Sequence, residues 1–124
     1  MGKTILGTAV GIVVWMATAL VLGLLLGKLW PALAVASRAP LTLTTAMLSA
    51  RLGVSFIGSL VSGAVSARLG GMNAAIAAGV LLLLGWGTFH VTVIWHQFPI
   101  WYHLTFFVSL VVLSWVGGRL ARAG

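Results

Sequence analysis

The 124-residue sequence contains no aspartate and no glutamate. The chain therefore has no carboxylate side chain for acid–base catalysis, for metal binding or for a proton relay. Cysteine is absent too, which excludes disulfides, thiolate nucleophiles and thiolate metal sites. Histidine, hydroxyl groups and arginine remain, with no acid to orient a histidine. An enzyme is accordingly the weakest functional class, and we expect no catalytic residues.

Charge of either sign is scarce. Charged residues make up 6% of the chain and hydrophobic residues 61%, whereas soluble domains contain roughly 25% charged residues. This composition predicts an integral membrane protein whose surface is covered by the lipid bilayer. The net charge of +7 comes from cations that stand one or two at a time beside apolar runs. Nucleic-acid-binding proteins gather their cations into a continuous patch, so we expect no nucleic-acid partner.

Four apolar runs approach the length of about 20 residues that a helix needs to cross a bilayer. They predict spans over about residues 4–27, 52–68, 72–95 and 100–118, within one transmembrane domain covering residues 1–124. The fold class expected from them is all-α, a membrane four-helix bundle with short loops. The first run and 32-ALAVAS-37 together resemble a signal peptide. Signal peptides have apolar regions of about 7–15 residues, so we expect this longer run to remain a span.

The segment 37-SRAPLTLTTAMLSA-50 separates the first two spans. Its threonines make it too polar for a clear span, and Pro40 suits the first turn of a helix. We therefore expect an interfacial helix, or an extension that leads into Arg51. The alternative is a longer second span from about Leu41. That span would bring Arg51 into the bilayer at a cost of roughly 2.5–3.5 kcal/mol, so the shorter span is favoured.

The cations divide almost evenly between the two sides of the membrane. The side that holds both termini carries Lys3, Arg68, Arg119 and Arg122. The other side carries Lys28, Arg38 and Arg51. Positive residues favour the cytoplasmic side, which predicts a multi-pass protein of the bacterial cytoplasmic membrane with cytoplasmic termini. A difference of four against three is also compatible with dual topology.

One face of the second span is small and polar when the residues are placed at 100° intervals on a helix. This face, called the serine stripe, consists of Arg51, Ser55, Gly58, Ser59, Ser62, Gly63 and Ser66. Small residues let membrane helices approach closely and hydroxyls bond across the contact, so the stripe predicts helix packing. Gly7 and Gly11, spaced by four in the first span, offer a matching surface. The alternative is a hydroxyl-lined route for a small neutral or anionic solute, with Arg51 at its mouth.

Histidines and aromatic residues gather around the turn between the third and fourth spans. The cluster consists of His90, Trp95, His96, Trp101, Tyr102 and His103. Aromatic side chains at headgroup level form the ordinary membrane belt, although a lipid or quinone headgroup site is an alternative. Three histidines could bind zinc or copper. Because Pro99 interrupts the cluster and no acid is present as a supporting partner, we expect no metal and no cofactor.

Two motifs, 62-SGAVSARLGG-71 and 99-PIWYHLTFFVSLVVLSWVGGRLAR-122, resemble small four-span membrane proteins of proteobacteria. In that group a glycine-rich second span ends in an Ala-Arg boundary, and a Trp-Tyr pair follows a proline. The resemblance covers about the last two thirds of the chain and implies no activity. We expect a non-catalytic accessory or structural subunit that packs through its small-residue faces with itself or with a larger membrane complex. The alternative is a small oligomeric channel or transporter that uses Arg51 and the serines.

Overall fold

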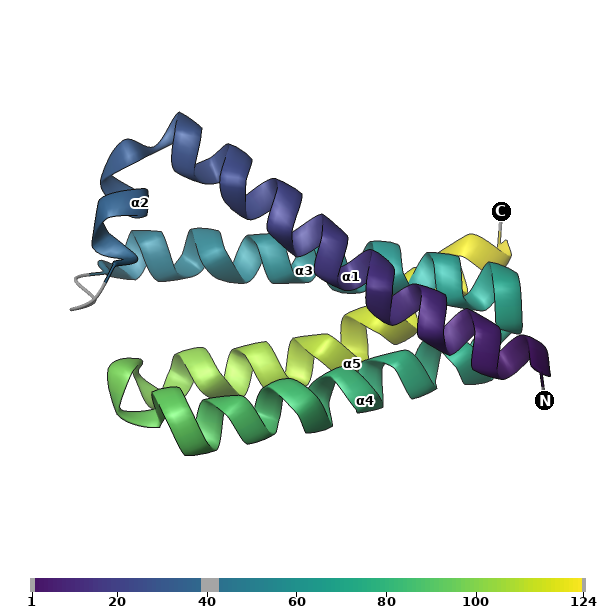
Figure 1. Ribbon diagram of the computed structural model, residues 1–124. Coiled ribbons are helices and arrows are strands. Elements are labelled where there is room, and N and C mark those ends of the chain that lie inside the picture. The colour runs from purple at the N-terminus through teal and green to yellow at the C-terminus, as the bar shows by residue number, and fades with distance from the viewer. Residues whose placement is uncertain (1, 39–42, 124) are drawn as a thin grey trace.

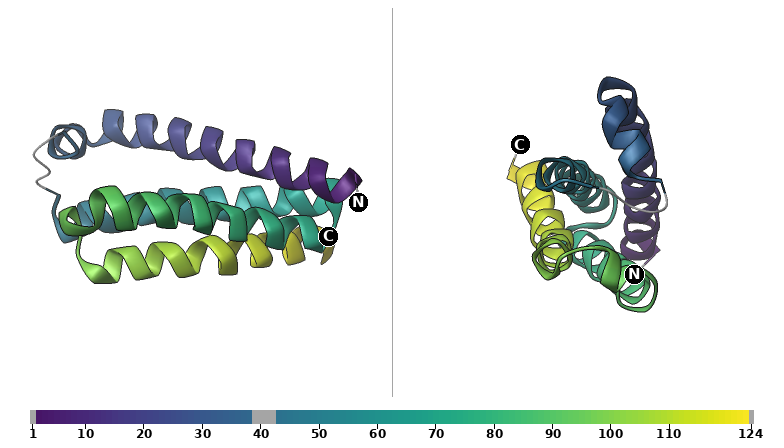
Figure 2. Two further views of the ribbon diagram at one scale, coloured as in Figure 1. Left: turned by 60° about the horizontal axis from the view of Figure 1, so that its bottom comes forward. Right: turned by 90° about the vertical axis from the view of Figure 1, so that its left-hand side faces the viewer.

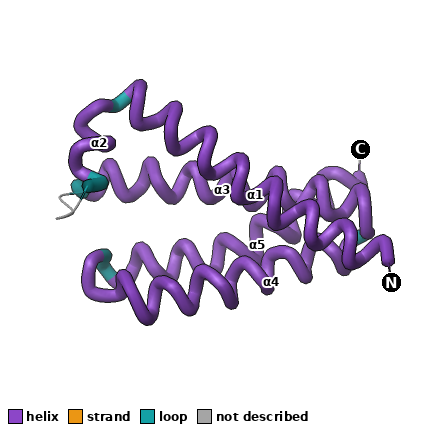
Figure 3. The backbone as a smooth tube through the Cα atoms, in the orientation of Figure 1, coloured by secondary structure: helices purple, strands orange, loops and turns teal. Residues whose placement is uncertain are grey.

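The computed structural model describes residues 2–38 and 43–123, and four long helices form a bundle (Figure 1). They are α1 (Gly2–Leu29), α3 (Thr45–Gly70), α4 (Met72–Phe89) and α5 (Ile100–Ala123), with a short α2 (Pro31–Ala36) between the first two. Helix accounts for nearly all of the described backbone (Figure 3). The predicted fold class, an all-α bundle with an additional short helix, is confirmed.

Four helical segments are long and apolar enough to cross a membrane: Gly2–Leu29, Thr45–Gly70, Met72–Gln97 and Ile100–Arg122. At 1.5 Å per residue even the shortest is about 35 Å long, which exceeds a hydrocarbon core of about 30 Å. The exposed faces of these helices are rich in leucine, isoleucine and valine. The chain is thus a multi-pass membrane protein.

The connection between α1 and α3 differs from the predicted one. The short helix lies at Pro31–Ala36, before the 37–50 segment, because Pro31 lacks an N–H and suits a first helical turn. Pro40 and Leu41 lie outside the described residues. α3 begins at Thr45, seven residues before the start of the predicted span, and the Thr44 hydroxyl accepts a hydrogen bond from the backbone N–H of Met47 at 3.2 Å. This N-cap places Arg51 inside α3, in its second turn.

The other two connections are tight. Gly71 alone separates α3 from α4, with a φ of 82° that glycine adopts without strain. α4 continues as a π-helical segment, His90–Ile94, and a 3₁₀ turn, Trp95–Gln97. Pro99 then precedes α5. Short links of this kind hold α3, α4 and α5 side by side.

α3 packs most extensively against α5 and α1 and also contacts α4 (Figure 2). α1 follows α3 only over its first half, where its buried residues are Gly7, Thr8, Gly11 and Trp15. Its second half leaves α3, and α2 leads the chain back (Figure 1). The main apolar core consists of Trp15, Leu48, Leu52, Leu82, Phe98, Tyr102, Phe106 and Leu110.

Candidate functional site

The serine stripe lies inside the bundle. Ser59, Ser62 and Ser66 are fully buried, and Ser55 nearly so. The Ser62 hydroxyl donates to the carbonyl oxygen of Gly11 in α1 at 2.7 Å. On the same side, the Trp15 indole N–H donates to the Ser59 hydroxyl at 3.2 Å. These two bonds join α3 to α1 across the stripe.

Glycines bring the helix backbones close together on both sides of α3. A Cβ atom at Gly63 would overlap the Ser114 carbonyl of α5, and one at Gly117 would overlap the Leu60 carbonyl of α3. Toward α1, a Cβ at Gly7 would lie 2.7 Å from the Ser66 carbonyl oxygen. Only glycine permits these contacts. They place α1 on one flank of the serine stripe and α5 on the other.

The stripe hydroxyls differ in their hydrogen bonding, since Ser62 has a partner in α1 and Ser66 has none among the described residues. If the stripe serves only helix packing, replacing Ser62 should cost more stability than replacing Ser66. Ser62→Ala should lower the free energy of unfolding by about 0.6 kcal/mol, the average for a hydrogen bond between membrane helices. Ser66→Ala should leave it unchanged or raise it, because the Ser66 hydroxyl is buried with no hydrogen-bond partner among the described residues. Unfolding by denaturing detergent in mixed micelles measures both variants. A larger loss for Ser66→Ala than for Ser62→Ala would contradict a purely packing role.

A cavity of about 880 Å³ lies where α1 separates from the other helices. Its apolar wall is made by Trp15, Leu24, Leu33, Trp86 and Phe106. Polar residues line it as well: Lys28, Ser37, Arg51, Ser55, His90 and Tyr102. The cavity therefore joins a tryptophan-rich interior to a cationic rim.

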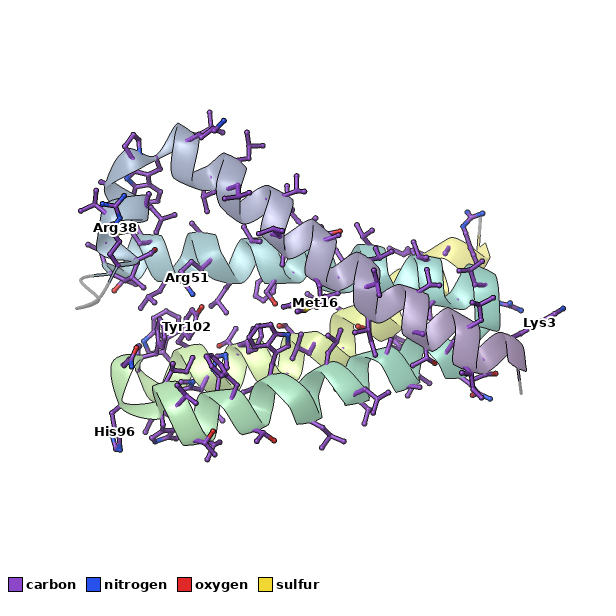
Figure 4. All side chains as sticks on the ribbon, viewed as in Figure 1. Lys3, Met16, Arg38, Arg51, His96 and Tyr102 are labelled. Carbon is purple, nitrogen blue, oxygen red and sulfur yellow. The ribbon has the colours of Figure 1, made fainter. Side chains whose placement is uncertain are left out.

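Arg51 reaches from α3 toward Tyr102 of α5 across this rim (Figure 4). Its Nε donates to the Tyr102 hydroxyl at 3.4 Å and its Nη1 to the Ser37 hydroxyl at 3.5 Å, both long bonds. The guanidinium carbon lies 5.5 Å from the centre of the Phe98 ring, in cation–π geometry. A guanidinium has five N–H donors, and the sequence offers no acidic side chain to accept from them. Arg51 is thus a half-buried cation without a counterion from any side chain of its own chain.

His90 and His103 form a hydrogen-bonded pair beside the cavity. Their Nδ1 atoms lie 2.8 Å apart, and Nε2 of His103 lies 3.0 Å from the Trp95 carbonyl oxygen. Because a carbonyl only accepts, His103 carries its hydrogen on Nε2, and with both rings neutral His90 donates from Nδ1 to His103. His90 Nε2 then keeps a free lone pair in a ring that lines the cavity and stacks on Phe106 at 4.6 Å.

The structure brings together part of the predicted histidine and aromatic cluster. His90, Tyr102 and His103 lie beside one another, and Trp95 stacks on His103 with ring centres 4.5 Å apart. His96 points away from the bundle (Figure 4), and Trp101 is exposed. Among residues 2–38 and 43–123, no group of three histidine, cysteine or acidic side chains could hold a metal ion.

Two features of the site were missed by the sequence reasoning. His90 and His103 stand on opposite sides of the connection between α4 and α5, so an antiparallel pair of helices can bring them opposite each other. That signal was available. The contact of Trp15 with Trp86, with ring centres 5.6 Å apart, depends on how far α1 follows α3, and no local pattern shows it.

No protein-family model, curated protein or solved structure matches this chain. The resemblance to small four-span proteins of proteobacteria stays a prediction, and the site is interpreted from its own chemistry.

Proposed function

We propose that this chain is a non-catalytic membrane subunit that receives a transmembrane helix of another subunit, either a second copy or part of a larger complex. It belongs to the bacterial cytoplasmic membrane, with both termini in the cytoplasm. The observation that carries the proposal is Gly85, a small residue in the second half of α4 that lies in an apolar groove and has no close packing partner among the described residues.

Gly85 is exposed, and a Cβ there would meet no heavy atom within 4 Å. It lies in an apolar groove of about 480 Å³ between α1 and α4, lined by Ile12, Met16, Leu81, Leu82, Gly85, Trp86 and Phe89. Glycine costs about 0.5–1 kcal/mol relative to alanine within a helix. At Gly63 and Gly117 close helix packing explains this cost, and at Gly85 a helix from another subunit supplies the same explanation.

The polar groups of the site support a role without catalysis. His103 is oriented by a backbone carbonyl, and no acid is present to orient either histidine. A channel or transporter that uses the serine stripe is the alternative function. No observation favours it, because both flanks of the stripe are filled by α1 and α5 within one chain.

Gly85→Leu should abolish association, since a leucine side chain fills the groove that the incoming helix occupies. The measurement is the mass of the complex extracted from native membranes in mild detergent. Gly53→Leu is the matched control, because a Cβ at Gly53 also meets nothing within 4 Å, whereas Gly53 does not line the groove. A wild-type protein that is extracted as a lone monomer with no accompanying subunit would overturn the proposal.

A further inference from the structure

The cavity between α1 and the rest of the bundle combines a cationic rim with an apolar interior. We propose that it binds an anionic amphiphile, whose head pairs with Arg51 and whose hydrocarbon tail lies among Trp15, Trp86 and Phe106. This inference does not rest on the groove at Gly85, which shares Trp86 and Phe89 with the cavity but contains neither Arg51 nor Trp15.

The charge of Arg51 gives the first argument. Arg51 lies in the second turn of α3, about 9 Å along the helix from Thr45. Within a membrane-spanning helix a guanidinium is paired or reaches water. Its two hydrogen bonds go to neutral hydroxyls at 3.4 Å and 3.5 Å, which leaves other N–H donors for a ligand.

The sign of the ligand follows from the rest of the chain. Lys28 lines the same cavity, and Arg38 lies at the same end of the bundle (Figure 4). The sequence has no Asp or Glu, so no side chain of this protein can be the counterion of Arg51. An acidic group that pairs with Arg51 therefore belongs to another molecule. Phosphate and carboxylate groups match the planar fork of an arginine.

The shape of the site favours an amphiphile over a free ion. The cavity volume of about 880 Å³ is within the range of about 300–1,000 Å³ that is usual for small-molecule sites. Its lining includes Leu24 and Leu25, which are also exposed on the outer surface of α1. A tail can therefore enter from the surrounding lipid and leave its head at the rim.

Head charge decides which amphiphile binds. A hydrocarbon tail gains little when it moves from bulk lipid into an apolar cavity, because the two environments are alike. Selectivity then comes from the charge-assisted hydrogen bonds at Arg51. We expect lipids with the same tails to be distinguished by their heads alone.

Native mass spectrometry of delipidated protein in mild detergent tests this directly. Dioleoyl phosphatidylglycerol should bind one molecule per chain about tenfold more tightly than dioleoyl phosphatidylcholine. Oleate should compete with phosphatidylglycerol, because it joins a carboxylate to a similar tail. Inorganic phosphate at millimolar concentration should not compete. Displacement by phosphate would show a site for a free ion and overturn the proposal.

Two variants address the head and the tail separately. Arg51→Ala should remove the preference for phosphatidylglycerol, and Arg51→Lys should keep part of it. Ala19→Trp should block the cavity while the charge of Arg51 is kept, because Ala19 lines the cavity wall. Arg119→Ala is the matched control, since Arg119 is an exposed arginine that stacks on Trp115 at 5.6 Å, far from the cavity.

Circular dichroism and thermal unfolding identify any variant that fails to fold. If either Arg51→Ala or Ala19→Trp fails to fold, the other variant decides whether the proposal holds. An unchanged preference for phosphatidylglycerol in a folded Arg51→Ala or Ala19→Trp protein would overturn the proposal. Equal binding of phosphatidylglycerol and phosphatidylcholine to the wild type would overturn it too. Crosslinking of a partner protein's carboxylate to Arg51, in place of lipid, would also overturn the proposal. None of these results bears on the groove at Gly85, whose test is the mass of the complex.

Discussion

Gly63→Ala should lower the free energy of unfolding by about 1–3 kcal/mol, the usual range for overpacking a close contact. A Cβ at Gly63 would overlap the backbone carbonyl of Ser114, and a carbonyl cannot rotate away as a side chain does. α3 and α5 must therefore move apart at Gly63. Their second close contact, between Gly117 and the Leu60 carbonyl, opposes this movement. Unfolding in mixed micelles, followed by circular dichroism, measures the loss.

Gly53→Ala is the matched control for Gly63→Ala. The added methyl group at Gly53 has open space around it and should be neutral or stabilising, because alanine favours the helix. Equal midpoints for the two alanine variants would show that α3 and α5 tolerate separation, contrary to the close packing described above.

His103→Ala should cost about 2–4 kcal/mol of unfolding free energy. His103 is fully buried, and its removal leaves a void. It also leaves His90 Nδ1 and the Trp95 carbonyl without the partners they now have at 2.8 Å and 3.0 Å. Thermal unfolding in detergent, followed by circular dichroism, measures the loss.

The comparison for His103→Ala is His96→Ala, which removes an exposed imidazole with no hydrogen bond among the described residues. This variant should unfold at the wild-type temperature. A His103→Ala protein that also unfolds at the wild-type temperature would show that the histidine pair contributes nothing to holding α4 against α5.

The bundle could be predicted from the sequence because hydropathy alone separates four apolar runs in a chain that is 6% charged. Helix ends were harder to predict. The start of α3 at Thr45 depends on a threonine cap, and the short helix begins at Pro31, ahead of the segment in which we expected it. Both are local signals that compete with similar ones nearby, because other threonines and prolines stand close to them in the sequence.

The candidate site could be predicted only in part. The periodicity of α3 shows which of its residues share a face, but it does not show that α1 leaves α3 after Trp15. The cavity forms because α1 separates from α3. Arg51 therefore lies at the rim of a candidate binding site and not only at the end of the serine stripe. Tertiary geometry of this kind has no periodic signature in a single chain.

The single residue between α3 and α4 has a consequence for the order of assembly. Bringing the ends of a loop together costs entropy that grows with loop length, and Gly71 makes this loop as short as a helical hairpin allows. α1 joins the others through residues 30–44, a much longer connection. We expect α3 and α4 to enter the bilayer as a preformed hairpin. α1 then docks later against the backbone of α3 at Ser62 and Ser66, which is uncovered until α1 arrives.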